Sequence, residues 1–145
     1  MLSVFSDVQK LYKNQGYDLV DFKISKKGCI FTLKQIEKKP RPHCPNCGER
    51  MHIYDHNSRF IRDMPSFPDL PQYLELSYKR LRCPSCGETL TEDSDLKYPG
   101  TRITYRAAEW IQYFYRHNMT IKSIADITGF HWETVKFIAL AGDRS

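Results

Sequence analysis

The spacing of hydrophobic residues predicts a helix and then a β-hairpin in the first part of the chain. Apolar residues recur at helical spacing over Val4–Asn14, and Gly16 follows where a glycine can end a helix. Apolar and charged residues alternate over Asp18–Ser25, as in a half-buried strand, and Cys29–Ile36 forms the return strand after the turn Lys26–Gly28. The apolar face of the first strand comprises Val20, Phe22 and Ile24.

The middle of the chain has a weaker pattern, which predicts short strands and loops. Met51–Tyr54 and Arg59–Arg62 are short strand candidates on either side of a polar turn. Three prolines within Met64–Pro71 predict a loop. Tyr73–Arg82 is the longest strand candidate, and its end is basic. The acidic and polar segment Glu88–Gly100 predicts a linker and a domain boundary.

The last third of the chain has a helical period. Apolar residues at i, i+3, i+4 and i+7 predict a helix over Tyr105–His117. A second helix begins after Thr120, a suitable N-cap, and Gly129 stands where a C-terminal glycine is expected. A third helix extends from about Trp132 to Ala141. The last two helices, Ile121–Leu140, match a helix-turn-helix unit.

Two near copies of one motif carry the strongest chemical signal: Cys44-Pro45-Asn46-Cys47-Gly48 and Cys83-Pro84-Ser85-Cys86-Gly87. Four thiolates from two such turns complete the closed tetrahedral shell that a structural Zn²⁺ prefers. The sequence therefore predicts one structural zinc bound by Cys44, Cys47, Cys83 and Cys86. Other chemistry stays open, because one CxxC pair could be a redox site and nearby histidines could replace a thiolate. The nearby histidines are His43, His52 and His56.

Three further features have an ordinary structural interpretation beside a functional one. Cys29 has no CxxC partner, so we expect a buried apolar residue instead of a reactive thiol. Glu92, Asp93 and Asp95 could be offered as a catalytic carboxylate cluster, but a solvated linker is expected. The basic segment Lys38–Pro42 could follow a phosphate backbone or simply connect two elements.

Size, composition and charge narrow the class of protein. The 145 residues carry a formal net charge of +5, which permits a nucleic-acid partner without requiring one. No apolar run approaches the length of a membrane span, and the N-terminus lacks the features of a signal peptide. We therefore expect a cytoplasmic protein without a membrane partner, in a compartment where paired CxxC motifs bind metal more often than they form disulfides.

These patterns together predict an α+β fold, in which an N-terminal β-hairpin and a four-cysteine zinc ribbon are followed by a three-helix helix-turn-helix domain. The predicted domains are an N-terminal helix and β-hairpin over residues 1–42, a zinc ribbon over 43–97, and a helix-turn-helix DNA-binding domain over 98–145.

The start of the third helix is the candidate DNA-reading surface. A recognition helix presents its early residues to base edges in the major groove. Lys136 is a base or phosphate contact, Glu133 could accept from a cytosine or favour the helix dipole, and Trp132 could belong to either core or surface. The predicted contacts are His131, Trp132, Glu133 and Lys136. The alternative for the whole segment is a helical bundle without a ligand.

The order of these motifs resembles the N-terminal region of the ISL3 family of bacterial insertion-sequence transposases. The resemblance rests on the hairpin Asp18–Ile36, the two cysteine motifs, the stretch Arg59–Pro65, the basic strand before the second pair, and the helix-turn-helix. One departure is the compact spacing of Cys83 and Cys86, which is wider in many members. A larger one is that no RNase H-like catalytic domain with its acidic metal ligands follows the helices in this sequence.

The resemblance implies binding of double-stranded DNA at the inverted repeats of transposon ends, in the bacterial cytoplasm on the nucleoid. We expect the DNA-binding portion alone, with no catalytic residue and no strand-transfer activity. A dimer on paired ends is a further expectation, although no dimer seam is visible in the pattern. Basic residues on the ribbon and before the helices would contact phosphates: Lys79, Arg80, Arg82, Arg102 and Arg106.

Three alternatives belong to other functional classes. The chain could be a zinc-ribbon scaffold that binds a protein through Tyr113, Tyr115 or the proline-rich loop. It could be a DNA binder of the transcription-regulator type. It could also be a thiol oxidoreductase, which would have a redox-active pair and no bound metal.

Overall fold

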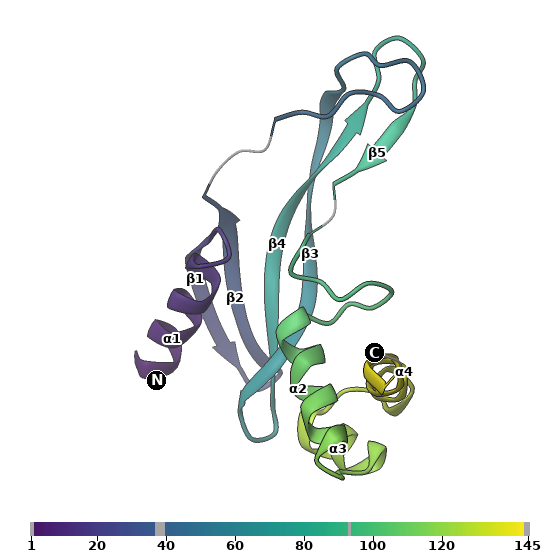
Figure 1. The fold of residues 1–145 in the computed structure, drawn as a ribbon. Helices are drawn as coiled ribbons and strands as arrows, with labels where there is room; N and C mark the ends of the chain where they lie inside the picture. The colour runs from purple at the N-terminus through teal and green to yellow at the C-terminus, as the bar shows by residue number, and fades with distance from the viewer. Residues whose placement is uncertain (1, 37–39, 93, 144–145) are drawn as a thin grey trace. The chain divides into compact units, whose positions relative to one another are not determined.

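The computed structural model describes residues 2–36, 40–92 and 94–143. Within them, no helix is long and apolar enough to cross a membrane. Asp93 and part of the predicted basic linker, Lys38 and Lys39, lie outside the described residues. The elements in chain order are α1 (Leu2–Lys13), β1 (Tyr17–Ser25), β2 (Gly28–Gln35), β3 (His52–Phe67), β4 (Leu70–Arg82), β5 (Thr89–Thr91), α2 (Tyr105–Arg116), α3 (Ile121–Thr128) and α4 (Trp132–Asp143) (Figure 1).

The predicted fold class is wrong. The described residues form a mixed α/β structure with a five-stranded sheet and four helices, and not a hairpin followed by a separate three-helix helix-turn-helix domain. The sheet has the order β1-β2-β4-β3, and β5 pairs with β4. The hairpin of β1 and β2 therefore belongs to the same sheet as the strands between the cysteine motifs. The pattern within each strand could not show this, because sheet membership depends on pairing between distant strands.

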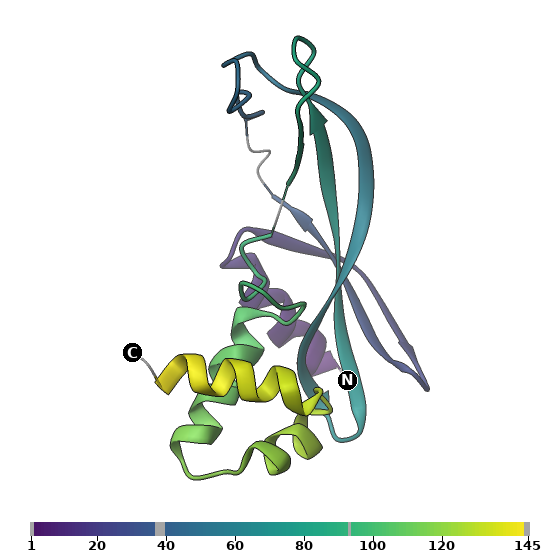
Figure 2. The same cartoon turned by 90° about the vertical axis from the view of Figure 1, so that its right-hand side faces the viewer.

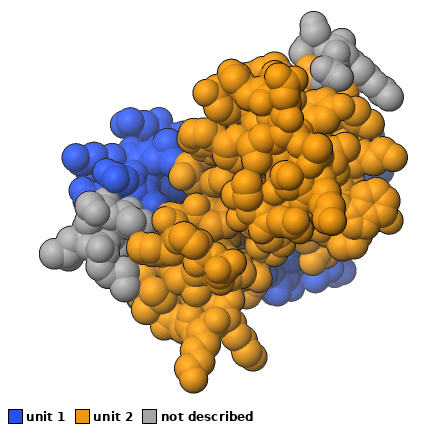
Figure 3. Space-filling model, turned by 90° about the horizontal axis from the view of Figure 1, so that it is seen from below, with its two compact units in different colours: residues 1–21, 32–59, 75–94 blue, residues 22–31, 60–74, 95–145 orange. Residues whose placement is uncertain are grey.

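The chain divides into two compact units, shown in different colours in Figure 3. Unit 1 comprises residues 1–21, 32–59 and 75–94, and unit 2 comprises residues 22–31, 60–74 and 95–145. Strands β1 to β4 each pass from one unit into the other. The predicted boundaries at residues 42 and 97 stay predictions.

The N-terminal helix is confirmed, because α1 buries Val8 and Tyr12 on one side. The predicted apolar face of β1 is only partly confirmed: Phe22 is half-buried and its ring contacts Phe31, but Val20 is 57% exposed and Ile24 is 46% exposed. β1 is at an end of the strand order, and the neighbouring strand β2 buries Cys29 and other apolar side chains instead. The expectation of a buried Cys29 is confirmed.

Two predictions between the cysteine motifs are wrong, because β3 and β4 form one long hairpin where short strands and a proline loop were expected. Pro65 lies inside β3, which is an edge strand in the sheet order, and an edge strand tolerates a residue without an N–H. Pro68 and Asp69 form the connection, and Asp69 has a φ of 58°. A proline followed by a residue at positive φ is typical of a type II turn, so the prolines shape the hairpin without ending it.

The expected linker Glu88–Gly100 is also partly wrong. It begins with β5, and Leu96 within it is buried. The second half of the segment also forms backbone hydrogen bonds. The Tyr98 N–H donates to the Ile103 carbonyl, and the Tyr105 N–H donates to the Leu96 carbonyl. One end of the segment therefore pairs with β4, and Leu96 and Tyr98 are bonded to residues at the start of α2 and just before it, so these parts are ordered structure and not a solvated linker.

The core of unit 2 lies among α2, α3 and α4, and α4 packs against both other helices (Figure 2). The predicted caps are confirmed: the Thr120 side chain accepts from the Ser123 N–H at 3.1 Å, and Gly129 ends α3 with a φ of 76°. The prediction that Trp110 faces inward is wrong, because this residue is 42% exposed and packs its ring against Tyr113 on the same helix. The residues predicted to face inward from α4 are buried: Val135, Ile138 and Ala139.

A buried carboxylate fixes the start of α2 to the β3–β4 hairpin within unit 2. Asp63 is fully buried in β3, and its side chain accepts from Thr104 Oγ1 at 2.8 Å and from Gln72 Nε2 at 2.9 Å. Thr104 also caps α2, because its oxygen accepts from the Ala107 N–H at 3.1 Å. Arg106 Nη1 lies 3.2 Å from Asp63 Oδ1 and supplies the opposite charge that a buried carboxylate requires.

Candidate metal centre

The two cysteine motifs fold into matching turns, named here the first knuckle (Cys44–Gly48) and the second knuckle (Cys83–Gly87). The Gly48 N–H donates to the Cys44 carbonyl at 2.9 Å, and the Gly87 N–H donates to the Cys83 carbonyl at 3.1 Å. Both glycines have positive φ, 79° and 78°, a conformation that costs glycine little. The repeated sequence therefore produces a repeated backbone that aims two pairs of thiols.

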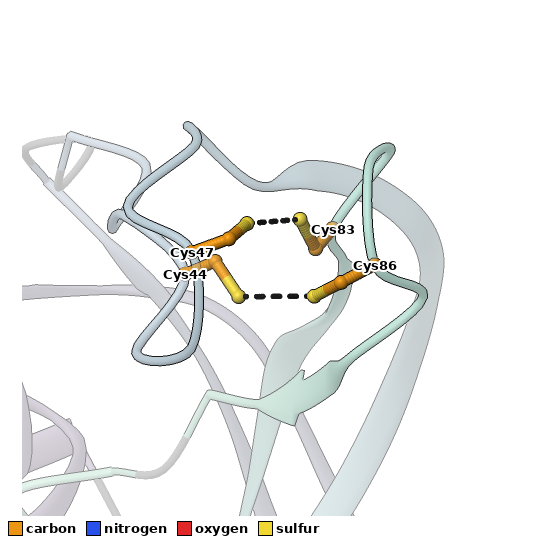
Figure 4. A group of neighbouring side chains, drawn as sticks. All are labelled: Cys44, Cys47, Cys83 and Cys86. Carbon is orange, nitrogen blue, oxygen red and sulfur yellow. Dashed lines mark hydrogen bonds between the residues drawn. The ribbon is translucent and has the colours of Figure 1, made fainter.

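The four sulfurs converge, as Figure 4 shows. Cys44 Sγ is 3.5 Å from Cys86 Sγ, and Cys47 Sγ is 3.3 Å from Cys83 Sγ, so each contact joins one knuckle to the other. All four sulfur atoms lie within 4.8 Å of one another. A tetrahedral zinc with Zn–S bonds of about 2.3 Å holds its sulfurs about 3.8 Å apart, and this group fits that spacing. The four cysteines form the site of one structural zinc.

The thiols of this group differ in how easily they lose a proton. Hydrogen bonds from the backbone N–H of Cys86, and further ones from Ser85 and from neighbouring sulfurs, lower the pKa of Cys83 to about 7 despite burial. The backbone N–H of Glu49 lowers the pKa of Cys47, but the sulfur of Cys83, burial and the other two thiols outweigh it and raise that pKa to about 12. A cation that binds the four sulfurs replaces the protons that they would otherwise share.

The surroundings of the knuckles hold them together. Met51 and Leu81 are buried with Cys44 and Cys83 in a small apolar cluster. Asn46 Nδ2 donates to Glu88 Oε2 at 2.9 Å, which links the first knuckle to the residue after the second. The metal-binding group within the described residues contains cysteines alone, so the predicted alternative of a histidine ligand finds no support there.

The separation of the two knuckles in sequence has a structural explanation. The intervening segment is the β3–β4 hairpin, whose β4 leads into the second knuckle, while β5 leaves it and pairs with β4. The register pairs Arg82 with Thr89 on either side of that knuckle. A zinc ion with four thiolate ligands has no open coordination position. The role of the ion is therefore structural: it stabilises the fold of this end of unit 1.

The residues predicted to read bases lie at the start of α4 in unit 2. His131, Trp132, Glu133 and Lys136 are all exposed. Trp132, for which the sequence left core and surface open, is 52% exposed, and its ring stacks near His131. The fourth residue of the helix, Val135, is buried, which turns the predicted contacts away from the helical core.

The residues predicted to contact phosphates are divided between the two units. Arg80 and Arg82 of unit 1 are exposed and lie over the ring of Tyr54, at 5.3 Å and 4.8 Å. Lys79, also of unit 1, is half-buried. In unit 2, Arg102 is exposed. Arg106 is held by Asp63, as described above.

Arg62 is a residue whose position the sequence did not indicate. Its guanidinium lies over the rings of Tyr73 and Phe130, at 5.2 Å and 5.1 Å, and so joins the hairpin to the turn between α3 and α4. With Arg102 and His131 it lines a pocket of about 490 Å³ in unit 2. No local signal could have revealed this contact, because Arg62 and Phe130 are far apart in the sequence.

A comparison with protein families identifies the ribbon. Residues 40–86 match the family described as the zinc-finger of transposase IS204/IS1001/IS1096/IS1165. The match includes all four cysteines and the β3–β4 hairpin between the knuckles. Searches of curated proteins and of solved structures found no match. The zinc ribbon of this transposase family is therefore present in the chain.

Proposed function

We propose that the chain is the DNA-binding portion of an insertion-sequence transposase and recognises the inverted repeats at transposon ends. The transposase zinc ribbon at residues 40–86 supports the protein class. The observation that carries the proposal of base recognition is the exposed start of α4, which follows α3 across the turn at Gly129.

The pair α3 and α4 suits the role of a helix-turn-helix. Ile124 of α3 and Val135 of α4 are buried in one core, so the second helix is held by the first. This packing leaves Trp132, Glu133 and Lys136 in solvent, on the early turns from which a recognition helix contacts base edges. Lys136 suits guanine or phosphate, and Glu133 can accept from a cytosine amino group.

Basic side chains outside α4 would set the register on the duplex without reading sequence. Lys79, Arg80 and Arg82 serve this role in unit 1, and Arg102 and Arg106 serve it in unit 2. Arg106 is restrained by its ion pair with Asp63, so it would act with its charge already partly balanced. Binding by such contacts weakens steeply as salt rises.

The proposal also implies a place and an assembly. The protein would act in the bacterial cytoplasm, on nucleoid DNA, and a dimer would hold two transposon ends. Sedimentation of the zinc-loaded chain with one and two equivalents of end duplex measures whether such a dimer forms. The catalytic step would belong to an RNase H-like domain, and no catalytic residue is proposed here.

Fluorescence anisotropy with the element's own end duplex and a scrambled duplex of equal length tests the proposal. We expect tighter binding to the end duplex, and a loss of discrimination of about 1–3 kcal/mol in Lys136→Ala. Lys10→Ala, which removes an exposed charge from α1, should keep the discrimination. Equal affinity of the unmodified protein for both duplexes would refute sequence-specific recognition.

A second candidate function is a scaffold that binds a protein. The observation in its favour is the exposed aromatic surface of α2, where Trp110 and Tyr113 are 42% and 45% exposed and their rings are in contact. Tyr115 is half-buried against the core of unit 2. Absence of DNA binding at low salt, together with a partner that copurifies and is lost in Tyr113→Ala, would favour this function.

A further inference from the structure

A groove in unit 1 collects basic side chains from four segments that are far apart in the sequence. Lys34 comes from the end of β2, Arg41 from the segment before the first knuckle, Arg50 from the segment after it, and Lys79 from β4. The groove has a volume of about 720 Å³. Lys79 was predicted to contact phosphate, and Arg41 belongs to the basic segment Lys38–Pro42, for which a phosphate contact was one of two interpretations.

The charges in the groove are poorly balanced within the described residues. Glu92 is the one acidic residue in the described lining, against four cations. Among the described parts of the chain, none of the four cations forms an ion pair with a carboxylate. Like charges gathered at one place repel each other and create a positive potential, which a bound polyanion relieves.

The lining of the groove is partly apolar, because it includes Ile53 and Tyr78 as well as the cations. A sugar–phosphate backbone has the matching chemistry, since it alternates negative phosphates with less polar sugars. Lys34, Arg41 and Arg50 are exposed, so their charged ends are accessible to such a ligand.

Two of these cations, Arg41 and Arg50, flank the first knuckle on its two sides. The backbone of His43 pairs with that of Arg50 in an antiparallel bridge around the first knuckle. The Met51 N–H donates to the Pro42 carbonyl at 3.0 Å, which ties the residue after Arg50 to the residue after Arg41. These backbone contacts around the first knuckle fix the spacing of the backbones of the two arginines, next to two of the zinc ligands.

We infer that this groove of the zinc ribbon binds the phosphate backbone of duplex DNA, as a second contact that carries no sequence information. The inference rests on the proposed function and deepens it, because it assigns to unit 1 a site separate from the start of α4. The site explains why a structural zinc would be part of a DNA-binding chain: the ion orders a phosphate-binding surface.

The test is the salt dependence of binding to the end duplex and to the scrambled duplex, measured with the zinc-loaded full chain. Each phosphate contact contributes about 0.9 to the slope of log K against log salt. Arg41→Gln/Arg50→Gln should lower the slope by about 1.8 and weaken both duplexes by the same factor. Lys34→Gln/Lys79→Gln, a pair that lies on the strands β2 and β4, should do the same.

Matched controls separate the groove from general charge. Lys10→Gln/Lys13→Gln removes two exposed charges from α1, in the same unit, and should leave the slope unchanged. Zinc content and circular dichroism confirm that each variant is folded. Unchanged slopes in both groove variants, or an equal change in the control, would overturn the inference even if the unmodified protein prefers the end duplex. Loss of that preference alone in the groove variants would also overturn it.

Discussion

At the scale of single residues, the surroundings of each cysteine decide its chemistry. Cys29 is fully buried, and burial raises its pKa, so it behaves as an apolar side chain. The sulfurs of the four knuckle cysteines lie within 4.8 Å of one another. Four thiolates this close repel each other, and a bound cation removes this repulsion. The difference was visible in the sequence, because Cys29 lacks the CxxCG pattern.

The first prediction concerns the zinc ligands. Cys83→Ser should abolish stoichiometric zinc binding and unfold the knuckle end of unit 1, because metal binding of this kind is worth on the order of 10 kcal/mol. Elemental analysis of the purified protein measures the zinc content. Cys29→Ala is the matched control and should retain one zinc per chain. Zinc retained at full occupancy in Cys83→Ser would contradict the assignment.

The second prediction compares two aspartates with different surroundings. Asp63→Ala leaves Thr104, Gln72 and Arg106 without their buried partner and should lower the free energy of unfolding by about 3–5 kcal/mol. Asp55→Ala removes an exposed ion pair with Arg80 and should cost at most about 1 kcal/mol. Urea denaturation of both zinc-loaded variants measures the two losses in free energy of unfolding. Equal losses would contradict the greater contribution expected of the buried network.

At the scale of elements, the turn before α4 determines where the proposed recognition helix begins. Gly129 has a φ of 76°, and a side chain added there would meet only Arg62 Nη2, at 3.6 Å. Gly129→Ala should therefore destabilise the protein through backbone strain alone, by about 1–2 kcal/mol. Gly129→Asn should cost less, because asparagine tolerates this conformation. Thermal unfolding distinguishes the two, and an alanine variant as stable as the original would refute the argument.

The sequence predicted elements well where the pattern is local. The caps at Thr120 and Gly129 follow from residue type and spacing alone. The length of β3 was missed because its prolines have a different effect at a sheet edge and in a turn than in a central strand. The same reasoning explains the error at Trp110, whose helical spacing matched a core face that the neighbouring helices do not cover.

The candidate site shows the same division between local and distant information. The zinc ligands were predictable because two copies of one short motif specify both chemistry and backbone shape. The basic groove was not, since Lys34, Arg41, Arg50 and Lys79 come together only through the pairing of strands and the closure of the first knuckle. The fold class was wrong for the same reason.

At the scale of the whole molecule, the zinc and the helical core belong to different units. The cysteines lie in unit 1, and the buried cluster among α2, α3 and α4 lies in unit 2. Removal of zinc by a chelator should therefore abolish hydrogen-exchange protection around both knuckles while the helices of unit 2 keep theirs. Readdition of zinc should restore the lost protection. Simultaneous loss of protection in α2–α4 would contradict this independence.

Chemical footprinting of the zinc-loaded chain on a DNA fragment that carries the element's end tests the central proposal most directly. We predict protection confined to the inverted repeat, with base contacts that are lost in Lys136→Ala while backbone protection persists. Protection spread evenly along the fragment, or none at low salt, would contradict recognition of transposon ends by this chain.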